Sequence, residues 1–235
     1  PDVQVLNGSV CFRHDSSYMY CDSAYFYELT NSLEAFSNVR MEQGDTLFVY
    51  GNYLHYDGNT QLARLRDNVR MENIPDKVTL FTDSLNYDRV TNIGYYFDGG
   101  LIVDEENELS SYLGQYSPST KMTIFNDSVK LKNPKFTLYS DTLQYNTASK
   151  IATILGPSTI VSDTGTVYTS RGWYDTIKNT SLLLDRSKVI SGSRLLIGDS
   201  ISYNRGMGYG EAFGHVFLQA TTQKVLLLGN YAYYN

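Results

Sequence analysis

Four regularly spaced aspartates are the side chains of this sequence best suited to chemistry. They are Asp22, Asp83, Asp141 and Asp199, and each is followed by a serine or a threonine. A row of carboxylates could supply the acid pair of a glycan-cleaving enzyme. A catalytic pair is needed only once, however, and these residues repeat. We therefore interpret them as corner residues whose side chains accept hydrogen bonds from backbone amides.

The histidines and the remaining polar motifs do not form a recognisable site. His14, His55 and His215 lie far apart, and none has a partner at the spacing of a zinc motif. The acidic run at 104–108 lacks the spacing of a calcium loop and is typical of a solvated turn. The glycines before Glu211 do not complete a nucleotide-binding fingerprint, because this glutamate occupies the last place. The sequence therefore predicts no enzymatic activity, no metal and no cofactor.

Charge and hydropathy exclude two further classes of protein. The 235-residue chain has 19 Lys and Arg against 25 Asp and Glu, and its net charge of −6 has the wrong sign for a nucleic-acid partner. The longest aliphatic run, Val225–Leu228, is far shorter than the roughly 20 residues of a membrane helix. The chain begins at Pro1 without an apolar leader, so the protein is either cytosolic or has lost a signal peptide.

The two cysteines leave two interpretations open. Cys11 and Cys21 lie ten residues apart, each near aromatic residues. A disulfide across a hairpin would fit an oxidising envelope compartment. Two reduced thiols would instead act as small apolar core residues.

Tyrosine is the most unusual feature of the composition, with 21 copies against 10 of phenylalanine and one of tryptophan. The phrase Asp-(Ser/Thr)-(Leu/Ile)-x-Tyr occurs at 83–87, 141–145 and 199–203, in steps of 58 residues, and degenerate copies lie halfway between. Extending the pattern in both directions gives eight aromatic positions spaced 29 to 31 residues apart: Phe26, Tyr56, Tyr87, Tyr116, Tyr145, Tyr174, Tyr203 and Tyr234. Eight repeats of this kind predict a stack of similar units.

Each repeat also contains a second phrase, and both phrases have the alternating pattern of a β-strand. Residues 34–39 recur as residues 211–216, with weaker copies at 65–69 and 125–129. Turn-forming Gly, Pro and Asn separate the segments, and no stretch has the apolar period of a helix. Two strands in each of eight repeats predict an elongated all-β fold of about sixteen strands.

The ends of the first phrase and the middle of the second carry a family resemblance. The first phrase ends in Tyr-(Asp/Asn) at 56–57, 87–88 and 145–146, and the second has its most regular copies at 38–41, 68–71 and 128–131. In register over eight copies, these phrases resemble the OstA-like proteins of lipopolysaccharide transport, the periplasmic bridge family. The resemblance extends over essentially the whole chain.

The resemblance implies an antiparallel β-jellyroll, folded over like a taco shell, in a single domain spanning residues 1–235. It implies a non-enzymatic, lipid-binding protein of lipopolysaccharide transport and outer-membrane assembly, located in the periplasm. The protein would be either the bridge itself or the soluble domain of the outer-membrane assembly subunit. Its interior would hold the acyl chains of lipid A, and its end strands would join other bridge components or further copies of itself.

An open stack of two sheets predicts a lipid groove from the residues alone. Slight splaying of the seam would admit an acyl chain, and each buried methylene contributes about 0.8 kcal/mol. The candidate lining residues are the same-face apolar positions of the two phrases: Leu54, Leu85, Leu143, Ile201, Val39, Val69, Val129, Val216, Phe36 and Phe213. The same residues would form the core of any β stack, so a purely structural role stays open.

The last apolar segment is the candidate assembly edge. Val225, Leu226, Leu227 and Leu228 include no charge or proline that would guard an unpaired strand. Either the natural protein continues past Asn235, or this edge receives another chain.

A basic alternation could in principle bind the phosphates of a lipid headgroup. Arg40, Arg64, Arg66 and Arg70 lie in the first third of the chain, and guanidinium groups match phosphate oxygens well. We favour a solvated strand face that needs no ligand.

Two other functions are compatible with the sequence. One is a carbohydrate-binding or carbohydrate-cleaving β-solenoid of the cell envelope that presents tyrosines as sugar-stacking platforms, with their hydroxyl groups in water. The other is a structural stack that assembles only with itself. A period of about 29 residues with two strands favours the lipid carrier, because a parallel β-helix would have shorter periods and three short strands per coil.

Overall fold

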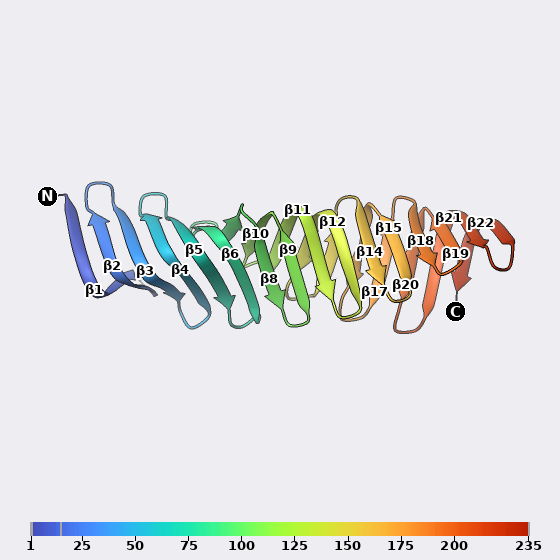
Figure 1. Ribbon diagram of the computed structural model, residues 1–235, viewed down its shortest axis with the longest axis horizontal. Coiled ribbons are helices and arrows are strands. Elements are labelled where there is room, and N and C mark those ends of the chain that lie inside the picture. Colours follow the sequence, from blue (N-terminus) through green and yellow to red (C-terminus); the bar gives the residue numbers. More distant parts are fainter. Residues whose placement is uncertain (1, 15, 235) are drawn as a thin grey trace. The chain divides into compact units, whose positions relative to one another are not determined.

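The computed structural model describes residues 2–14 and 16–234, and this part of the chain is all-β. It contains 22 strands, and neighbouring strands pair in an antiparallel manner (Figure 1). The chain divides into two compact units, Pro1–Thr123 and Ile124–Asn235. No helix that could cross a membrane is found among the described residues.

The first unit is built from six long strands followed by four short ones. These are β1 (Val3–His14), β2 (Ser17–Tyr27), β3 (Ser32–Gln43), β4 (Leu47–Asp57), β5 (Leu62–Asn73), β6 (Val78–Asp88), β7 (Ile93–Tyr96), β8 (Gly100–Asp104), β9 (Asn107–Ser111) and β10 (Leu113–Ser117). The boundary between the units falls within β11 (Met122–Asn133).

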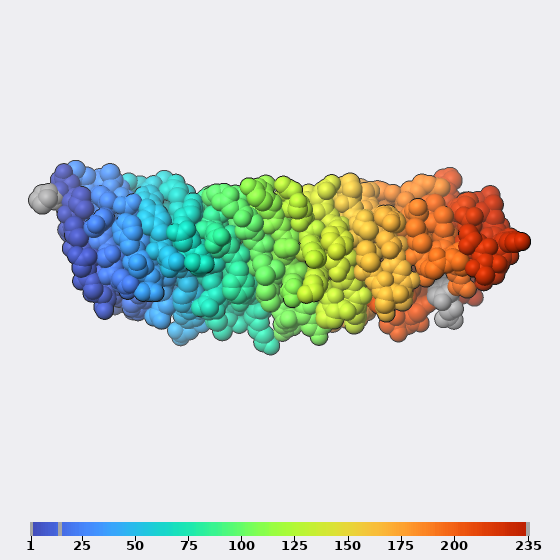
Figure 2. All heavy atoms as spheres, in the orientation of Figure 1, coloured from blue at the N-terminus to red at the C-terminus, as the bar shows by residue number. Residues whose placement is uncertain are grey.

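The second unit has long strands at both ends and short ones between them. After β11 come β12 (Phe136–Asn146), β13 (Ile151–Ile154), β14 (Ser158–Ser162), β15 (Gly165–Thr169), β16 (Arg171–Asp175), β17 (Thr180–Leu184), β18 (Ser187–Ser191), β19 (Arg194–Gly198), β20 (Ser200–Asn204), β21 (Tyr209–Ala220) and β22 (Val225–Tyr234). Figure 2 shows successive strands as successive bands of colour.

The prediction of sixteen strands is wrong, because the described residues form 22. Ten of the 22 strands have ten or more residues, and the other twelve have four or five. The short strands form six consecutive pairs, such as β7 with β8 and β13 with β14. Each pair takes the place of one long strand, since β6 pairs with both β7 and β8, and β12 pairs with both β13 and β14. The chain therefore makes sixteen passes, six of which are interrupted.

The interruptions lie where the uninterrupted strands bend. In β3, both Ser37 and Asn38 have positive φ angles, of 60° and 51°, and the pairing register shifts between Phe36 and Val39. Further pairs of left-handed residues follow the sequence repeat: Gly8–Ser9, Asp67–Asn68, Asp127–Ser128, Asp185–Arg186 and Gly214–His215. Gly, Asn, Asp and Ser tolerate such corners better than branched residues do.

The repeated aspartates face these corners. Asp83 accepts a hydrogen bond from the backbone N–H of Asn68 at 3.2 Å, which confirms its predicted role. Asp22 accepts one from the side-chain amide of Asn38 at 2.8 Å. At the corner near the C-terminus, a hydrogen bond with His215 and another from Arg186 lower the pKa of Asp199.

The bends divide each unit into two layers. Layer A contains β8, β9, β14, β15, β18 and β19, together with the halves of the long strands that pair with them. Layer B contains β7, β10, β13, β16, β17 and β20, again with the corresponding halves. Within each unit, one layer therefore lies on either side of the corners.

The four central tyrosines of the aromatic row lie inside layer B. Tyr87, Tyr116, Tyr145 and Tyr174 are each at most 8% exposed, so this row does not form the water-facing surface that the tyrosine pattern allowed. Each ring lies beside small residues on the neighbouring strands. In the first unit, Tyr56 and Tyr87 both pair with Ala63, and Tyr87 and Tyr116 both pair with Gly94. In the second unit the small partners are Ala152, Ser181 and Gly210.

Candidate functional site

In the first unit, the facing sides of layers A and B are apolar and closed to solvent. The strand register aligns Met41, Val49, Met71, Leu80, Ile102 and Leu109 in layer A. It aligns Ala35, Leu54, Leu65 and Leu85 in layer B. Apart from half-buried Met41, no member is more than 4% exposed. A Cβ atom added at Gly94 of layer B would lie only 3.4 Å from Cε of Met71 in layer A, so the Met71 side chain reaches across the interior toward layer B.

A tyrosine outside the aromatic row fills part of this interior. Tyr96 is 3% exposed, and its hydroxyl group hydrogen-bonds to Oγ of Ser111 at 2.7 Å. Burial raises the pKa of Tyr96 to about 12. A Cβ atom at Gly100 or Gly114 would lie within 2.6 Å of the ring. These two glycines therefore provide the space that the ring occupies.

The turns of layer A meet the turns of layer B on the side opposite the corners, which we term the mouth. Asp76 is the centre of the contacts there. It accepts hydrogen bonds from Lys121 at 2.5 Å and from Asn73 at 2.7 Å, and Tyr116 lies 2.8 Å from Asn73. Tyr87 also bonds across the mouth to Gln43, at 3.5 Å. Over these strands the interior of the first unit is sealed.

In the second unit, one layer opens progressively. The register aligns Leu138, Ile160, Val167, Val189, Leu196, Leu218 and Leu227 in layer A. Leu138 is fully buried and Ile160 is 9% exposed, but the residues from Val167 onward are half-buried, and Leu227 is 57% exposed. In Figure 2 these strands lie in the yellow to red part of the chain.

Layer B of the second unit stays closed along the same strands. Its inward residues are no more than 4% exposed: Leu143, Ile154, Leu183, Ile201 and Ala212. Across the mouth, the rings of Phe136 and Tyr174 pack edge to face with centroids 4.6 Å apart, and Lys135 donates to Asn179 at 3.2 Å. The second unit therefore has a closed interior near β12 and a solvent-accessible apolar strip from β15 to β22.

The comparison with known families identifies the chain. A family model described as OstA-like protein matches residues 1–141, which is more than half of the sequence. The chain belongs to the OstA-like family. This confirms the resemblance drawn from the repeated phrases, and the observed antiparallel all-β structure confirms the predicted fold class.

No curated protein matches the OstA-like chain. Among solved structures, it is similar to LptH, described as the LptA homologous periplasmic component of the conserved lipopolysaccharide transport device from Pseudomonas aeruginosa. The identity is 14%, the match covers 53% of this chain and 82% of that chain, and the TM-score is 0.37.

Eight of the ten predicted lining residues face the interior of this OstA-like protein. They are Leu54, Leu85, Leu143, Ile201, Val39, Val69, Val129 and Val216, and each is at most 4% exposed. Leu85 lies in the first unit and Leu143 in the second.

Phe36 and Phe213 do not line the interior. Alternation places the preceding residues, Ala35 and Ala212, inside the sheet, so the phenylalanines point outward. Phe36 packs between two tyrosines on the outer face, with ring centroids at 5.4 and 5.5 Å, and Phe213 is 41% exposed. The prediction placed Phe36 on the same face as Val39, although the two residues lie three positions apart, an odd step that puts them on opposite faces of a strand.

The sequence interpretation missed most of the layer A rows. Met71, Leu80 and Ile102 are among the most buried residues of the first unit, and Leu196 belongs to the accessible strip of the second. The sequence signal that could have indicated these residues is the apolar alternation in the half of each strand beyond the corner. The prediction included only the first layer A position after each corner, the valine of the second phrase, and otherwise followed layer B.

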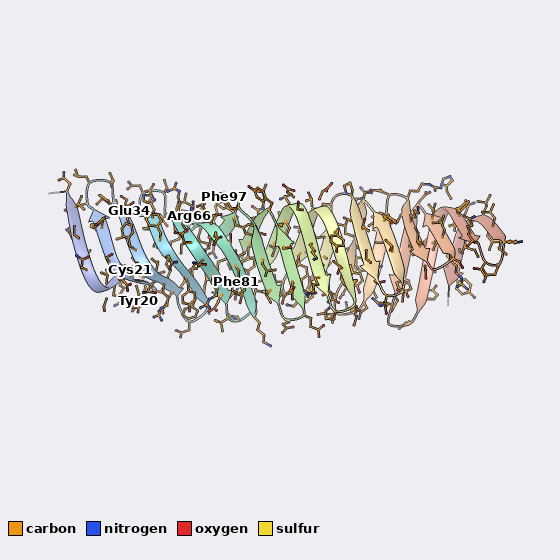
Figure 3. All side chains as sticks on the ribbon, viewed as in Figure 1. Tyr20, Cys21, Glu34, Arg66, Phe81 and Phe97 are labelled. Atoms are coloured by element: carbon orange, nitrogen blue, oxygen red, sulfur yellow. The ribbon has the colours of Figure 1, made fainter. Side chains whose placement is uncertain are left out.

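The four arginines are engaged with neighbours on the outer faces. Arg40 lies 4.6 Å from the ring centroid of Tyr20 and Arg70 lies 4.4 Å from that of Tyr50, and each also forms an ion pair with a glutamate two residues later. Arg64 contacts His55. Arg66 donates to the carbonyl oxygens of Leu65 and Leu85, and Figure 3 shows it near Phe97. These contacts agree with the solvated strand face.

The cysteines are both free, with Cys11 exposed and Cys21 buried. Cys21 pairs with Val10 rather than with Cys11, so no disulfide joins them. Burial raises the pKa of the Cys21 thiol. No group of three or more potential metal ligands occurs among the described residues, and the side chain of His14 lies outside that description.

The predicted assembly edge lies in the last strand, β22. Val225 is 40% exposed, Leu226 and Leu227 are each 57% exposed, and Leu228 is 75% exposed. The strand pairs with β21 along one edge. It therefore presents four exposed aliphatic side chains in succession.

Proposed function

We propose that this OstA-like protein carries lipopolysaccharide through the periplasm, without catalysis, by holding its acyl chains between the two layers. The observation that carries the proposal is the apolar strip of the second unit, where the inward residues from Val167 to Leu227 are accessible. An acyl chain of about 12 to 14 carbons buried on such a strip would contribute about 10 kcal/mol before entropic costs are subtracted.

The net charge of the chain supports binding of lipopolysaccharide through its acyl chains. The chain has a net charge of −6, so it gives little general attraction for an anionic headgroup. The arginines that could bind phosphate already have glutamate, aromatic or carbonyl partners. We propose that Leu54, Leu85, Leu143 and Ile201, with the buried valines of the second phrase, form the closed wall of the lipid path, and that the layer A strip forms its accessible wall.

The exposed strand β22 supports a role in assembly at the outer membrane. An apolar edge strand is a template for adding a strand from another chain. We propose that Val225–Leu228 joins a further transport component or a second copy of this chain. Replacing Leu226 by Lys should lower the mass measured by light scattering at high protein concentration, and an unchanged mass would contradict this assignment.

Native mass spectrometry of the 235-residue chain mixed with hexa-acylated lipid A tests the proposed lipid binding. Leu196→Glu places a charge on the accessible strip, and we expect the bound fraction to fall at least about fivefold because a carboxylate resists burial against acyl chains. Val161→Glu is the matched control, since Val161 lies on the outer face and is 42% exposed. The proposal fails if lipid A does not bind, or if both variants lose binding equally.

A further inference from the structure

The outer face of layer A in the first unit carries a groove that the proposed lipid path does not use. Its volume is about 560 Å³, within the range of small-ligand sites. It is lined by residues of β4, β5, β6 and β8, among them Tyr50, Arg70, Phe81 and Leu101, and by corner residues that include Asp83 and Asp98.

One wall of the groove is a row of side chains from neighbouring strands, in which a cationic residue lies between two aromatic ones. Tyr50 pairs with Arg70, Arg70 with Phe81, and Phe81 with Leu101. The guanidinium of Arg70 lies 4.4 Å from the ring centroid of Tyr50 and pairs with Glu72 at 3.2 Å. Phe81, labelled in Figure 3, is 43% exposed. A flat apolar ring is thus presented to solvent beside a fixed guanidinium.

The opposite side of the groove consists of polar corner residues on a fixed backbone. Oγ1 of Thr82 donates to the carbonyl oxygen of Gly99 at 2.7 Å, and the N–H of Gly99 donates to the carbonyl oxygen of Tyr112 at 2.9 Å. These bonds hold the corner that contains Asp98. Asp83 keeps its position through the bond from Asn68 at 3.2 Å. Both carboxylates are exposed, and both line the groove together with Tyr50 and Phe81.

The groove contains two carboxylates and one guanidinium, so its own charge is negative and its single cation is already paired. Phosphate, sulfate and uronate ligands are therefore disfavoured. Carboxylates accept strong hydrogen bonds from hydroxyl groups, and an aromatic face packs against an apolar surface. A pyranose ring offers both, with C–H groups on its face and hydroxyl groups at its edge. We infer that this groove binds a neutral oligosaccharide, by stacking on Phe81 and hydrogen bonding to Asp83 and Asp98.

The second unit contains a natural comparison position. Tyr139 lies 58 residues after Phe81, on the outer face, and is 47% exposed. It also has a cation beside it, since Nζ of Lys130 lies 5.9 Å from its ring centroid. The residue 58 positions after Asp98 is Gly156, however, so the second carboxylate is missing there. Tyr139 therefore has an aromatic ring and a neighbouring cation, as the groove has, but lacks the second carboxylate.

Saturation-transfer NMR of the 235-residue chain tests the inference with four separate probes: cellohexaose, chitohexaose, a neutral hexose oligosaccharide from the outer core released from lipopolysaccharide, and hexagalacturonate. We expect binding of at least one of the first three and weaker binding of the anionic hexagalacturonate. Phe81→Ala should weaken the bound sugar about tenfold through the lost ring contact. Asp98→Asn should weaken it about fivefold through loss of charge-assisted hydrogen bonds.

Tyr139→Ala is the matched control and should leave binding unchanged. Phe81→Leu, which keeps an apolar side chain, should also lose most of the binding, and melting curves of both Phe81 variants verify that they fold. Binding of the released core alone would indicate the sugar of a glycolipid, and binding of chitohexaose alone would indicate a wall glycan; either supports the inference. The inference is overturned if none of the neutral probes binds, if folded Phe81→Ala binds normally, or if Tyr139→Ala loses binding equally. Failure of lipid A binding would leave these outcomes unaffected, because the probes carry no acyl chains.

Discussion

The two units of the chain use the same strand pattern but close their interiors differently. In the first unit, the layer A residues Val49, Met71, Leu80 and Ile102 are at most 4% exposed, and Asp76 links the turns across the mouth. In the second unit, the corresponding row becomes half-buried from Val167 onward. A repeated backbone therefore does not fix how accessible its interior is.

Side chains at the turns bridge the mouth in both units, because Arg205 of the second unit pairs with Asp163 and donates to the carbonyl oxygen of Lys135; the difference lies at the later turns of layer A. The first unit places Asn73, Asp76 and Lys121 where the two sets of turns meet. The turn between β18 and β19 consists of Gly192 and Ser193, and it offers no long side chain that could reach across. A closed interior stabilises the fold, whereas an accessible interior leaves apolar surface for a ligand.

The largest expected effect concerns the cores of the two units. Leu80→Ala should lower the free energy of unfolding by about 2–5 kcal/mol, because it leaves a cavity in a closed interior. Leu196→Ala should cost about 1 kcal/mol or less, since its side chain is half-exposed before unfolding. Urea denaturation of the 235-residue chain, followed by hydrogen exchange to assign each loss to its unit, checks the comparison. Equal losses would contradict the difference between the interiors.

The next effect concerns the contacts at the mouth of the first unit. Asp76→Ala removes the acceptor for Lys121 and Asn73, and we expect a loss of about 1–2 kcal/mol because these groups are partly screened by solvent. Glu105→Ala is the control. The ion pair between Glu105 and Lys77 is solvated, since their side chains are 51% and 74% exposed, and it should contribute under about 0.5 kcal/mol. A similar loss from both variants in thermal unfolding would show that Asp76 has no special role.

A smaller effect should appear at alkaline pH. Burial raises the pKa of Tyr96 and of Tyr87 to about 12, from 10.0. Because the folded-state pKa is the higher one, this contribution to stability is complete below pH 10 and is lost as the pH rises toward 12. Tyr96→Phe should reduce the loss of stability between these values, measured by urea denaturation at each pH. If Tyr96→Phe loses as much stability over this pH range as the unaltered protein, the burial of this hydroxyl group is contradicted.

The sequence predicted the all-β class, because the alternation within each phrase is a property of the chain itself. It also indicated Asp83 as a corner residue, since an aspartate at a fixed place before each strand half suits a local hydrogen bond. The sixteen predicted strands became 22 because six of the passes are interrupted at their corners. Corners at Asp185–Arg186 and around Gly156 interrupt the pairing, whereas the corner at Ser37–Asn38 only shifts it.

The candidate site was predicted in part. The alternation placed Leu54 and Leu85 correctly inside, but the prediction assigned Phe36 to the face of Val39, although alternation over three positions puts Phe36 on the opposite face. The contacts of Asp76 with Lys121 join residues 45 positions apart. No local pattern encodes such a pair, so the closed mouth became visible only in three dimensions.

The most direct test of the central claim is site-specific photo-crosslinking to lipopolysaccharide. Benzoyl-phenylalanine would replace Leu196 on the accessible strip or, as a control, Tyr139 on the outer face of the same unit. If acyl chains lie between the layers of the second unit, the probe at 196 will crosslink to lipopolysaccharide and the probe at 139 will not. Absence of a crosslink at 196, or equal crosslinking at both positions, would contradict the account.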